Sequence, residues 1–185
     1  IPSLRAMYGA VRRAIFAGAG KPRTPEEPPP TFRVIHFSVL SNHLHLIVEG
    51  DSTAALSRGM KGLAVRIAWA VNRALKRKRG KVFSDRFHSH VLGTPRGANA
   101  ALHYLISNYR KHMAEVGRSL PSDFRDRCSS ADYLHAHPDD SPLPQPTTWL
   151  LRGGYVHGGG EIDLRKTPGS IPKPKPKPRA SAPRS

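Results

Sequence analysis

Two histidines separated by one residue, His43 and His45, are the sharpest candidate for chemistry in the sequence. They lie in a run rich in Leu, Ile and Val that predicts a β-strand, in which residues i and i+2 project from the same face. Two neutral imidazoles side by side on a rigid strand supply half of the ligands of a metal site. The alternative is two surface histidines in a chain that has 10, and the His-x-His pattern alone favours that alternative.

Tyr104 and Asn108 form the second candidate, in a segment whose apolar residues recur at helical spacing. The predicted core-facing stripe of this helix consists of Leu102, Leu105, Ile106, Tyr109 and Met113. At about 100° per residue, Tyr104 and Asn108 lie one turn apart on a different face. In isolation, Tyr104 is best explained as an ordinary exposed tyrosine. Beside a histidine pair, the two residues present a nucleophile and an amide oxygen that can bind a metal.

Hydrophobic periodicity predicts the elements that must position these residues. In chain order they are a helix over 4–15, strands over 32–40 and 44–49, a helix over 52–75, a strand over 86–92 and a helix over 95–113. Asp51 or Ser52 is expected to cap the second helix, and Thr94, followed by Pro95, is expected to begin the third.

Clusters of proline mark the boundaries between parts of the chain, because proline lacks an N–H group and fixes φ. We expect a compact domain that carries both candidates over 1–116, a loop-rich extension over 117–164, and a basic, proline-rich, disordered tail over 165–185. The tail is either an arm that binds nucleic acid or a solubilising end. Since the chain begins with Ile1 rather than Met, we expect its natural start to be missing.

The charge of the chain points to a polyanionic partner. Its 185 residues include 30 Lys and Arg against 13 Asp and Glu, a formal net charge of +17. This excludes an acidic partner-binding tail and an ordinary neutral metabolic enzyme, and favours nucleic acid first and an anionic membrane surface second. A single cysteine, Cys128, excludes an internal disulfide and a multi-cysteine zinc site, which fits a reducing cytoplasm. No apolar run approaches the roughly 18 residues of a membrane-spanning helix.

Positive charge is densest over residues 73–81, at the end of the second predicted helix, where no acidic residue occurs. The residues predicted to contact DNA phosphates are Arg73, Lys76, Arg77, Lys78, Arg79, Lys81, Arg86, Arg110 and Lys111. The alternative for the run is a solvated helix end that the helix dipole favours. A stretch this long without an acid exceeds what the dipole requires, so the run favours contact with DNA.

Several other polar or aromatic residues are assigned no chemical role. The histidines expected to face phosphate or solvent are His88, His90, His103 and His112. Glu49 is expected to be solvated at the end of its strand, with support of a metal ligand as the alternative. Trp69 and Trp149 are expected only to pack.

Three short segments, taken in order, resemble the single-tyrosine HUH transposases, and among them the REP-associated tyrosine transposases of bacteria. The segments are His-Leu-His at 43–45, Val-Phe-Ser-Asp-Arg-Phe-His at 82–88 and Tyr-Leu-Ile-Ser-Asn at 104–108. The resemblance extends from about residue 3 to residue 113, and residues 148–155 are similar to a segment found downstream in some members. His-x-His alone is a weak signature, whereas the three segments in this order are fairly specific.

The resemblance implies an α+β fold, with a ferredoxin-like antiparallel sheet and helices on one face, of the HUH endonuclease type. It also implies a strand before Leu4, which we expect to be absent or cut off in this sequence. The family often has Asn-Pro where this chain has Asn108 followed by Tyr109. Because the asparagine is retained, we expect this difference to change how the helix continues rather than how a metal is bound.

The same resemblance implies a function and its residues. His43, His45 and Asn108 would hold Mg²⁺ or Mn²⁺, and Tyr104 would be the catalytic nucleophile that forms a 5′-phosphotyrosine and releases a 3′-OH. The implied protein is a metal-dependent transposase and single-strand DNA endonuclease that cleaves and rejoins hairpin-containing DNA. It would act in the bacterial cytoplasm as a monomer or homodimer. Its partner would be single-stranded or hairpin DNA, and it would not bind a membrane. The sequence identifies no general base.

Two alternatives from other classes stay open. One is a domesticated DNA-binding protein that keeps the fold without catalysis. The other is a basic RNA-binding protein whose His-x-His pair is accidental.

Overall fold

The structure is a computed structural model that describes residues 4–24 and 26–166. Nearly all of the predicted basic tail therefore lies outside the described residues. The main elements are helix α1 (Leu4–Gly18), strands β1 (Phe32–Val39) and β2 (Leu44–Gly50), and helices α2 (Thr53–Ala74) and α3 (Pro95–Glu115). They are followed by the short elements η1 (Ala131–Tyr133), α4 (Trp149–Arg152) and η2 (Gly154–Gly158).

Both long helices that follow the strands begin where capping residues predict. The Ser52 hydroxyl accepts a hydrogen bond from the Ala55 backbone N–H at 3.1 Å, and the Thr94 hydroxyl accepts one from Gly97 at the same distance. Pro95 is the first residue of α3, where its missing N–H would have had no helical partner. The predicted starts of α2 and α3 are therefore confirmed.

β1 and β2 form an antiparallel hairpin that runs from the Phe32–Gly50 pair to the Val39–Leu44 pair. A bulge between Val34 and His36 places one extra residue on β1. All residues of β1 after Phe32 are buried, because both faces of the hairpin are covered. The hairpin is thus the central layer of the molecule.

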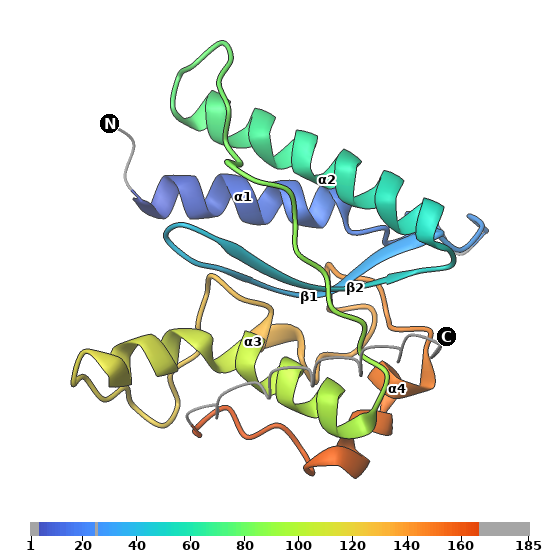
Figure 1. The fold of residues 1–185 in the computed structure, drawn as a ribbon, viewed down its shortest axis with the longest axis vertical. Coiled ribbons are helices and arrows are strands. Elements are labelled where there is room, and N and C mark those ends of the chain that lie inside the picture. The colour runs from blue at the N-terminus through green and yellow to red at the C-terminus, as the bar shows by residue number, and fades with distance from the viewer. Residues whose placement is uncertain (1–3, 25, 167–185) are drawn as a thin grey trace, which may run out of the picture.

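Helices pack on both faces of this hairpin (Figure 1). On one face, α1 and α2 enclose a core cluster that includes Ile15, Val34, Phe37 and Leu63. On the other face, α3 and the short C-terminal helices enclose a second cluster that includes Ile35, Ile47, Leu102, Leu105 and Ile106. The mixed α+β class is confirmed, but the expectation of helices on one face only is wrong. The apolar residues of the hairpin alternate between its two faces, so each face needs its own cover.

The predicted strand over 86–92 is absent from the described structure, which has a two-stranded sheet. This segment crosses from the α2 side of the hairpin to the α3 side as an extended connection (Figure 1). Phe87 and Val91 are 54% and 86% exposed, so the alternating pattern that suggested a strand does not bury an apolar face. A strand also needs a backbone partner, and this segment has none in the described part of the chain.

Backbone groups on the free edge of β1 are paired instead by the extension that follows α3. The Val39 N–H donates to the Cys128 carbonyl at 2.8 Å, and the Ser130 N–H donates to the Phe37 carbonyl at 2.8 Å. Leu143 joins the first core cluster, and other residues of 117–164 join the second. The extension therefore packs directly on the layers that carry the candidate residues. Among the described residues, no helix combines the length and apolar character needed to cross a membrane.

Candidate functional site

The histidine pair lies where β2 begins, on the face of the hairpin that α3 covers. The Nε2 atoms of His43 and His45 are 3.1 Å apart, and their ring planes meet at 85°. His43 Nδ1 lies 2.7 Å from Asn42 Oδ1, which accepts its proton, so the lone pair of His43 Nε2 faces His45 Nε2 and accepts a hydrogen bond from it. A second hydrogen bond that fixes the tautomer in this way is typical of metal-binding histidines.

Both imidazoles are held in their neutral form by their surroundings. Burial, and then the neighbouring imidazoles of His43 and His112, lower the pKa of His45 from 6.5 to about 4. Burial and His112 also lower the pKa of His43. A neutral imidazole keeps the lone pair with which it binds a metal ion. Near neutral pH the neutral pair can act as a Lewis base once the hydrogen bond between the two Nε2 atoms is exchanged for a metal ion.

Tyr104 reaches this pair from α3. Its ring centroid lies 5.5 Å from that of His45, with the two planes at 81°, so the imidazole and the phenol meet edge to face. The ammonium group of Lys111 lies 5.0 Å from the centre of the Tyr104 ring, and it also approaches Glu115 at 3.8 Å. The structure thus brings together the tyrosine, the histidine pair and one of the cations predicted to contact DNA.

Asn108 does not lie on an open face of α3 as the helix geometry suggested. It is fully buried, and neither its Oδ1 nor its Nδ2 atom has a hydrogen-bond partner among the described residues. A buried amide without partners is unusual, since most buried polar groups are paired with protein or water. Among the described residues no contact joins the Asn108 amide to His43 or His45, so the structure does not bring this predicted ligand together with the histidine pair.

The predicted core stripe of α3 is right for three residues and wrong for its C-terminal part. Leu102, Leu105 and Ile106 are buried, but Tyr109 is 37% exposed and stacks on Phe124. α3 packs on α4 and η2 as well as on the hairpin, so its buried residues lie on more than one side of the helix.

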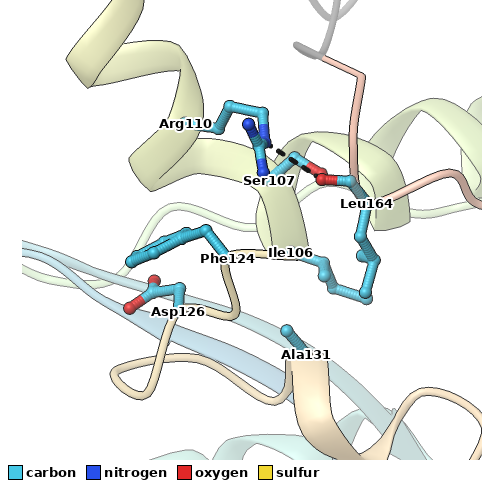
Figure 2. Close-up of a pocket in the computed structure, with 7 residues that line it drawn as sticks. All are labelled: Ile106, Ser107, Arg110, Phe124, Asp126, Ala131 and Leu164. Carbon is cyan, nitrogen blue, oxygen red and sulfur yellow. Dashed lines mark hydrogen bonds between the residues drawn. The ribbon is translucent and has the colours of Figure 1, made fainter. Parts of the chain in front are cut away.

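Arg110 is the clearest correction among the predicted DNA contacts. It is buried beside a small pocket, where its Nε donates to the Leu164 carbonyl at 3.0 Å (Figure 2). Its two terminal nitrogens donate to the carbonyls of Leu120 and Pro121 at 3.1 and 2.9 Å. The guanidinium is occupied by these backbone acceptors, so Arg110 joins the extension to α3 instead of facing a phosphate.

The other predicted phosphate contacts lie at the surface. These exposed residues are Arg73, Lys76, Arg77, Lys78, Arg79, Lys81 and Arg86. Within the described ranges, none of their side chains forms an ion pair or hydrogen bond with the protein. The loop that carries most of them is held by buried Asn72, whose Nδ2 donates to the Gly80 carbonyl at 2.9 Å. The cations are therefore displayed by an anchored loop and are available to an external anion.

Glu49 was missed by the sequence reasoning, and its expected solvation is wrong. Its carboxylate is buried and accepts hydrogen bonds from the backbone N–H and hydroxyl groups of Thr147 and Thr148, at 2.6–3.0 Å. Arg33 Nε lies 3.3 Å from the same carboxylate. Burial alone would raise the pKa of Glu49, but the hydrogen bonds from Thr148 and Thr147 outweigh it and lower the pKa. Neither residue type alone predicts this burial. The sequence could have indicated it only if the acid on the strand had been considered together with the later Thr147–Thr148 pair.

The donor set fits a divalent cation in type. Imidazole nitrogens and an amide oxygen are donor types that divalent cations accept, and the Asn108 oxygen has no protein partner that competes for it among the described residues. Across residues 4–24 and 26–166 there is no group of three or more His, Cys, Asp and Glu side chains that could hold a metal ion. A metal site here would therefore need the Asn108 amide as well as the histidine pair.

Comparison with known proteins gives no independent support for a family. No protein-family model, curated protein or solved structure matches the chain.

Proposed function

We propose that the protein is a metal-dependent single-strand DNA transesterase of the single-tyrosine HUH type, which cleaves and rejoins hairpin-containing DNA. The observation that carries the proposal is the contact between Tyr104 and His45, whose Nε2 faces that of His43. A phenol and a pair of imidazoles come from distant parts of the sequence and meet at one place. The ferredoxin-like sheet, the bacterial cytoplasm as location, and a monomeric or homodimeric state belong to the same proposal.

The tyrosine carries the chemical step. Tyr104 Oη attacks the phosphorus of a DNA phosphodiester, and the bond from phosphorus to the 3′ oxygen breaks as the new bond forms. The phenol loses its proton, the departing 3′ oxygen gains one, and the phosphoryl group stays on the enzyme as a 5′-phosphotyrosine. A free 3′-OH reverses the step without another energy source, because the ester conserves the phosphodiester linkage.

The neighbouring residues hold and orient the DNA phosphate. His43, His45 and Asn108 would hold Mg²⁺ or Mn²⁺, which supplies Lewis-acid polarisation of the scissile phosphate when bound. Lys111 lies close enough to the Tyr104 ring to contact a phosphate that reaches the phenol. The exposed cations of residues 73–81 supply sequence-independent affinity for the DNA backbone.

A covalent adduct tests the proposal. Labelled single strands that contain a hairpin are incubated with the protein and Mg²⁺, and protein-linked DNA is detected after denaturation. We expect an adduct with the wild type and none with Tyr104→Phe, which removes one oxygen and keeps the ring. Tyr109→Phe is the matched control on the same helix and should form the adduct normally. An adduct that persists in Tyr104→Phe and disappears in Tyr109→Phe identifies the other tyrosine as the nucleophile.

A DNA-binding protein without catalysis is the second candidate. The unpaired cations between Arg73 and Lys81 favour it, because they need neither the tyrosine nor a metal to bind phosphates. The absence of an adduct with every hairpin substrate, from a folded and metal-loaded protein, would select this candidate.

A further inference from the structure

The outer face of α2 exposes a large aromatic side chain where a packed one was expected. Trp69 is 74% exposed and Val65 is 43% exposed, whereas Leu63, Ile67 and Val71 of the same helix are buried in the core. At about 100° per residue, Trp69 lies on the side of α2 opposite to this buried stripe. An exposed indole offers a large apolar contact area, and its surroundings decide whether it is a binding surface.

Cations surround this tryptophan. Arg58, Lys61 and Arg66 are exposed and lie one to three helical turns before Trp69, on the same side of the helix. No acidic residue occurs between Asp51 and Asp85 in the sequence. None of the three cations has a carboxylate partner in the part of the chain that the structure describes. We call the surface formed by these three cations, Gly62, Val65 and Trp69 the α2 basic face.

The α2 basic face is hollowed beside the indole. Its six residues line an open depression, and a Cβ atom built at Gly62 meets no other atom within 4 Å. Arg66 leans towards Gly18 at the end of α1, since a Cβ at Gly18 would lie 3.3 Å from Arg66 Cδ. Gly62 has no side chain, and the Arg66 side chain extends towards Gly18, so both leave the ring of Trp69 accessible.

We propose that the α2 basic face binds single-stranded nucleic acid, with a base stacked on Trp69 and backbone phosphates on Arg58, Lys61 and Arg66. Sites for single strands combine an aromatic platform with a positively charged surface that follows the backbone. A duplex does not fit this chemistry, because its bases are stacked on one another. A membrane surface fits it less well, because an interfacial helix needs a broad apolar face and this face has two exposed apolar side chains.

This site goes beyond the transesterase proposed above. The α2 basic face lies opposite to the buried side of α2, and Tyr104 belongs to α3. Helices α2 and α3 cover opposite faces of the hairpin (Figure 1). Binding at the α2 basic face requires no metal, no nucleophile and no cleavage. The two proposals can therefore fail separately.

Tryptophan fluorescence measures the proposed contact directly. In Trp149→Phe, Trp69 is the remaining tryptophan of the chain, so its emission can be followed alone. Titration with an oligothymidylate of about 12 nucleotides, within the usual site size, should quench Trp69 through base stacking. Oligouridylate should quench it as well, since the indole stacks on the base and not on the sugar. Tyr104→Phe in the same background should show the same quenching, which separates this site from the catalytic proposal.

Affinity measured by anisotropy of a labelled oligothymidylate provides the second readout. Trp69→Ala should weaken binding by about five- to a hundredfold, the range for loss of one stacked base. Trp149→Ala is the matched control, because Trp149 is also exposed but stacks on His157 elsewhere in the chain. It should bind within about twofold of wild type. Replacing both Arg58 and Lys61 by Gln should reduce the slope of affinity against salt by about one to two units.

Three results would overturn the proposal. One is unchanged Trp69 emission with both oligonucleotides. The second is equal affinity of Trp69→Ala and wild type. The third is a Trp69 response to phosphatidylserine vesicles without a response to oligonucleotides, which would assign the α2 basic face to a lipid surface.

Discussion

Replacing Glu49 by Gln should destabilise the fold strongly, although this residue lies outside the candidate site. The Glu49 carboxylate is buried, pairs with Arg33, and accepts four hydrogen bonds from Thr147 and Thr148. Glutamine keeps one acceptor oxygen, but its NH₂ group would face two hydrogen-bond donors. Hydrogen bonds to charged groups contribute about 1.5–3 kcal/mol each, and breaking a buried ion pair costs about 3–5 kcal/mol. Since part of the network survives, we expect a loss of about 3 kcal/mol in the free energy of unfolding.

Thermal and urea unfolding measure this loss, and Asp51→Asn is the matched control. For a chain of this size, 3 kcal/mol corresponds to a fall in Tm of about 6–12 °C. Asp51 binds the same arginine, Arg33, at 2.7 Å, but its side chain is 51% exposed. Its replacement should therefore cost about 1 kcal/mol or less. A Glu49→Gln variant as stable as wild type, or less affected than Asp51→Asn, would refute this account of the network.

The pH dependence of the difference in unfolding free energy between wild type and Glu49→Gln provides an independent check. The pKa of Glu49 is lowered in the folded protein, so the carboxylate stabilises the fold above its ordinary pKa in the unfolded chain. This contribution is complete near pH 7 and is lost as the pH falls below about 4. The gap in stability between wild type and Glu49→Gln should therefore narrow in acid. A gap that widens as the pH falls would contradict the direction of the pKa shift.

Three further predictions concern the metal, the basic loop and α3. His45→Ala should abolish adduct formation but leave most DNA affinity, and normal cleavage in EDTA would refute a metal-dependent mechanism. Replacing Arg77, Lys78 and Arg79 by Gln should weaken binding to all DNA sequences and reduce the salt slope by roughly two to three units, as measured by anisotropy at several salt concentrations. Arg110→Met should lower Tm by several degrees and leave the salt slope unchanged, because its guanidinium binds backbone carbonyls; a lowered slope with an unchanged Tm would restore its role in DNA contact.

Local signals in the sequence predict the helices and the hairpin well. Capping by Ser52 and Thr94 depends on residues within one turn, and the hairpin follows from two apolar runs with a short connection. The shared face of His43 and His45 also follows from the strand period alone. These features can be predicted without knowing which elements pack against one another.

Long-range packing explains the predictions that were wrong. Asn108 and Arg110 are buried because elements far along the chain surround α3, which no helical wheel of residues 95–113 can show. The segment over 86–92 alternates like a strand, yet a strand exists only with a backbone partner. Glu49 became a buried acceptor because Thr147 and Thr148 donate to it from a distant loop. For Asn108, Arg110 and Glu49, the deciding contacts come from distant parts of the chain. For the segment over 86–92, the deciding factor is the lack of a partner strand.

The hydrogen bonds of Glu49 also affect the position of the histidine pair, because the alternation of β2 places Glu49 and His45 on the same face of the hairpin. Residues 43, 45, 47 and 49 alternate with side chains that face α1 and α2, so a register slip of one residue would turn every one of them to the wrong face. Ile47 is buried in the α3 cluster and Glu49 is fixed by two threonines, which hold the register at successive points of β2. The extension thereby adds a contact that favours the register in which His43 and His45 face Tyr104. Glu49→Gln should accordingly weaken the register of β2 as well as lower stability. Adduct formation measured well below its Tm should then fall in this variant but not in Asp51→Asn, and equal adduct yields in the two variants would show that the α3 contacts alone keep the histidines in place.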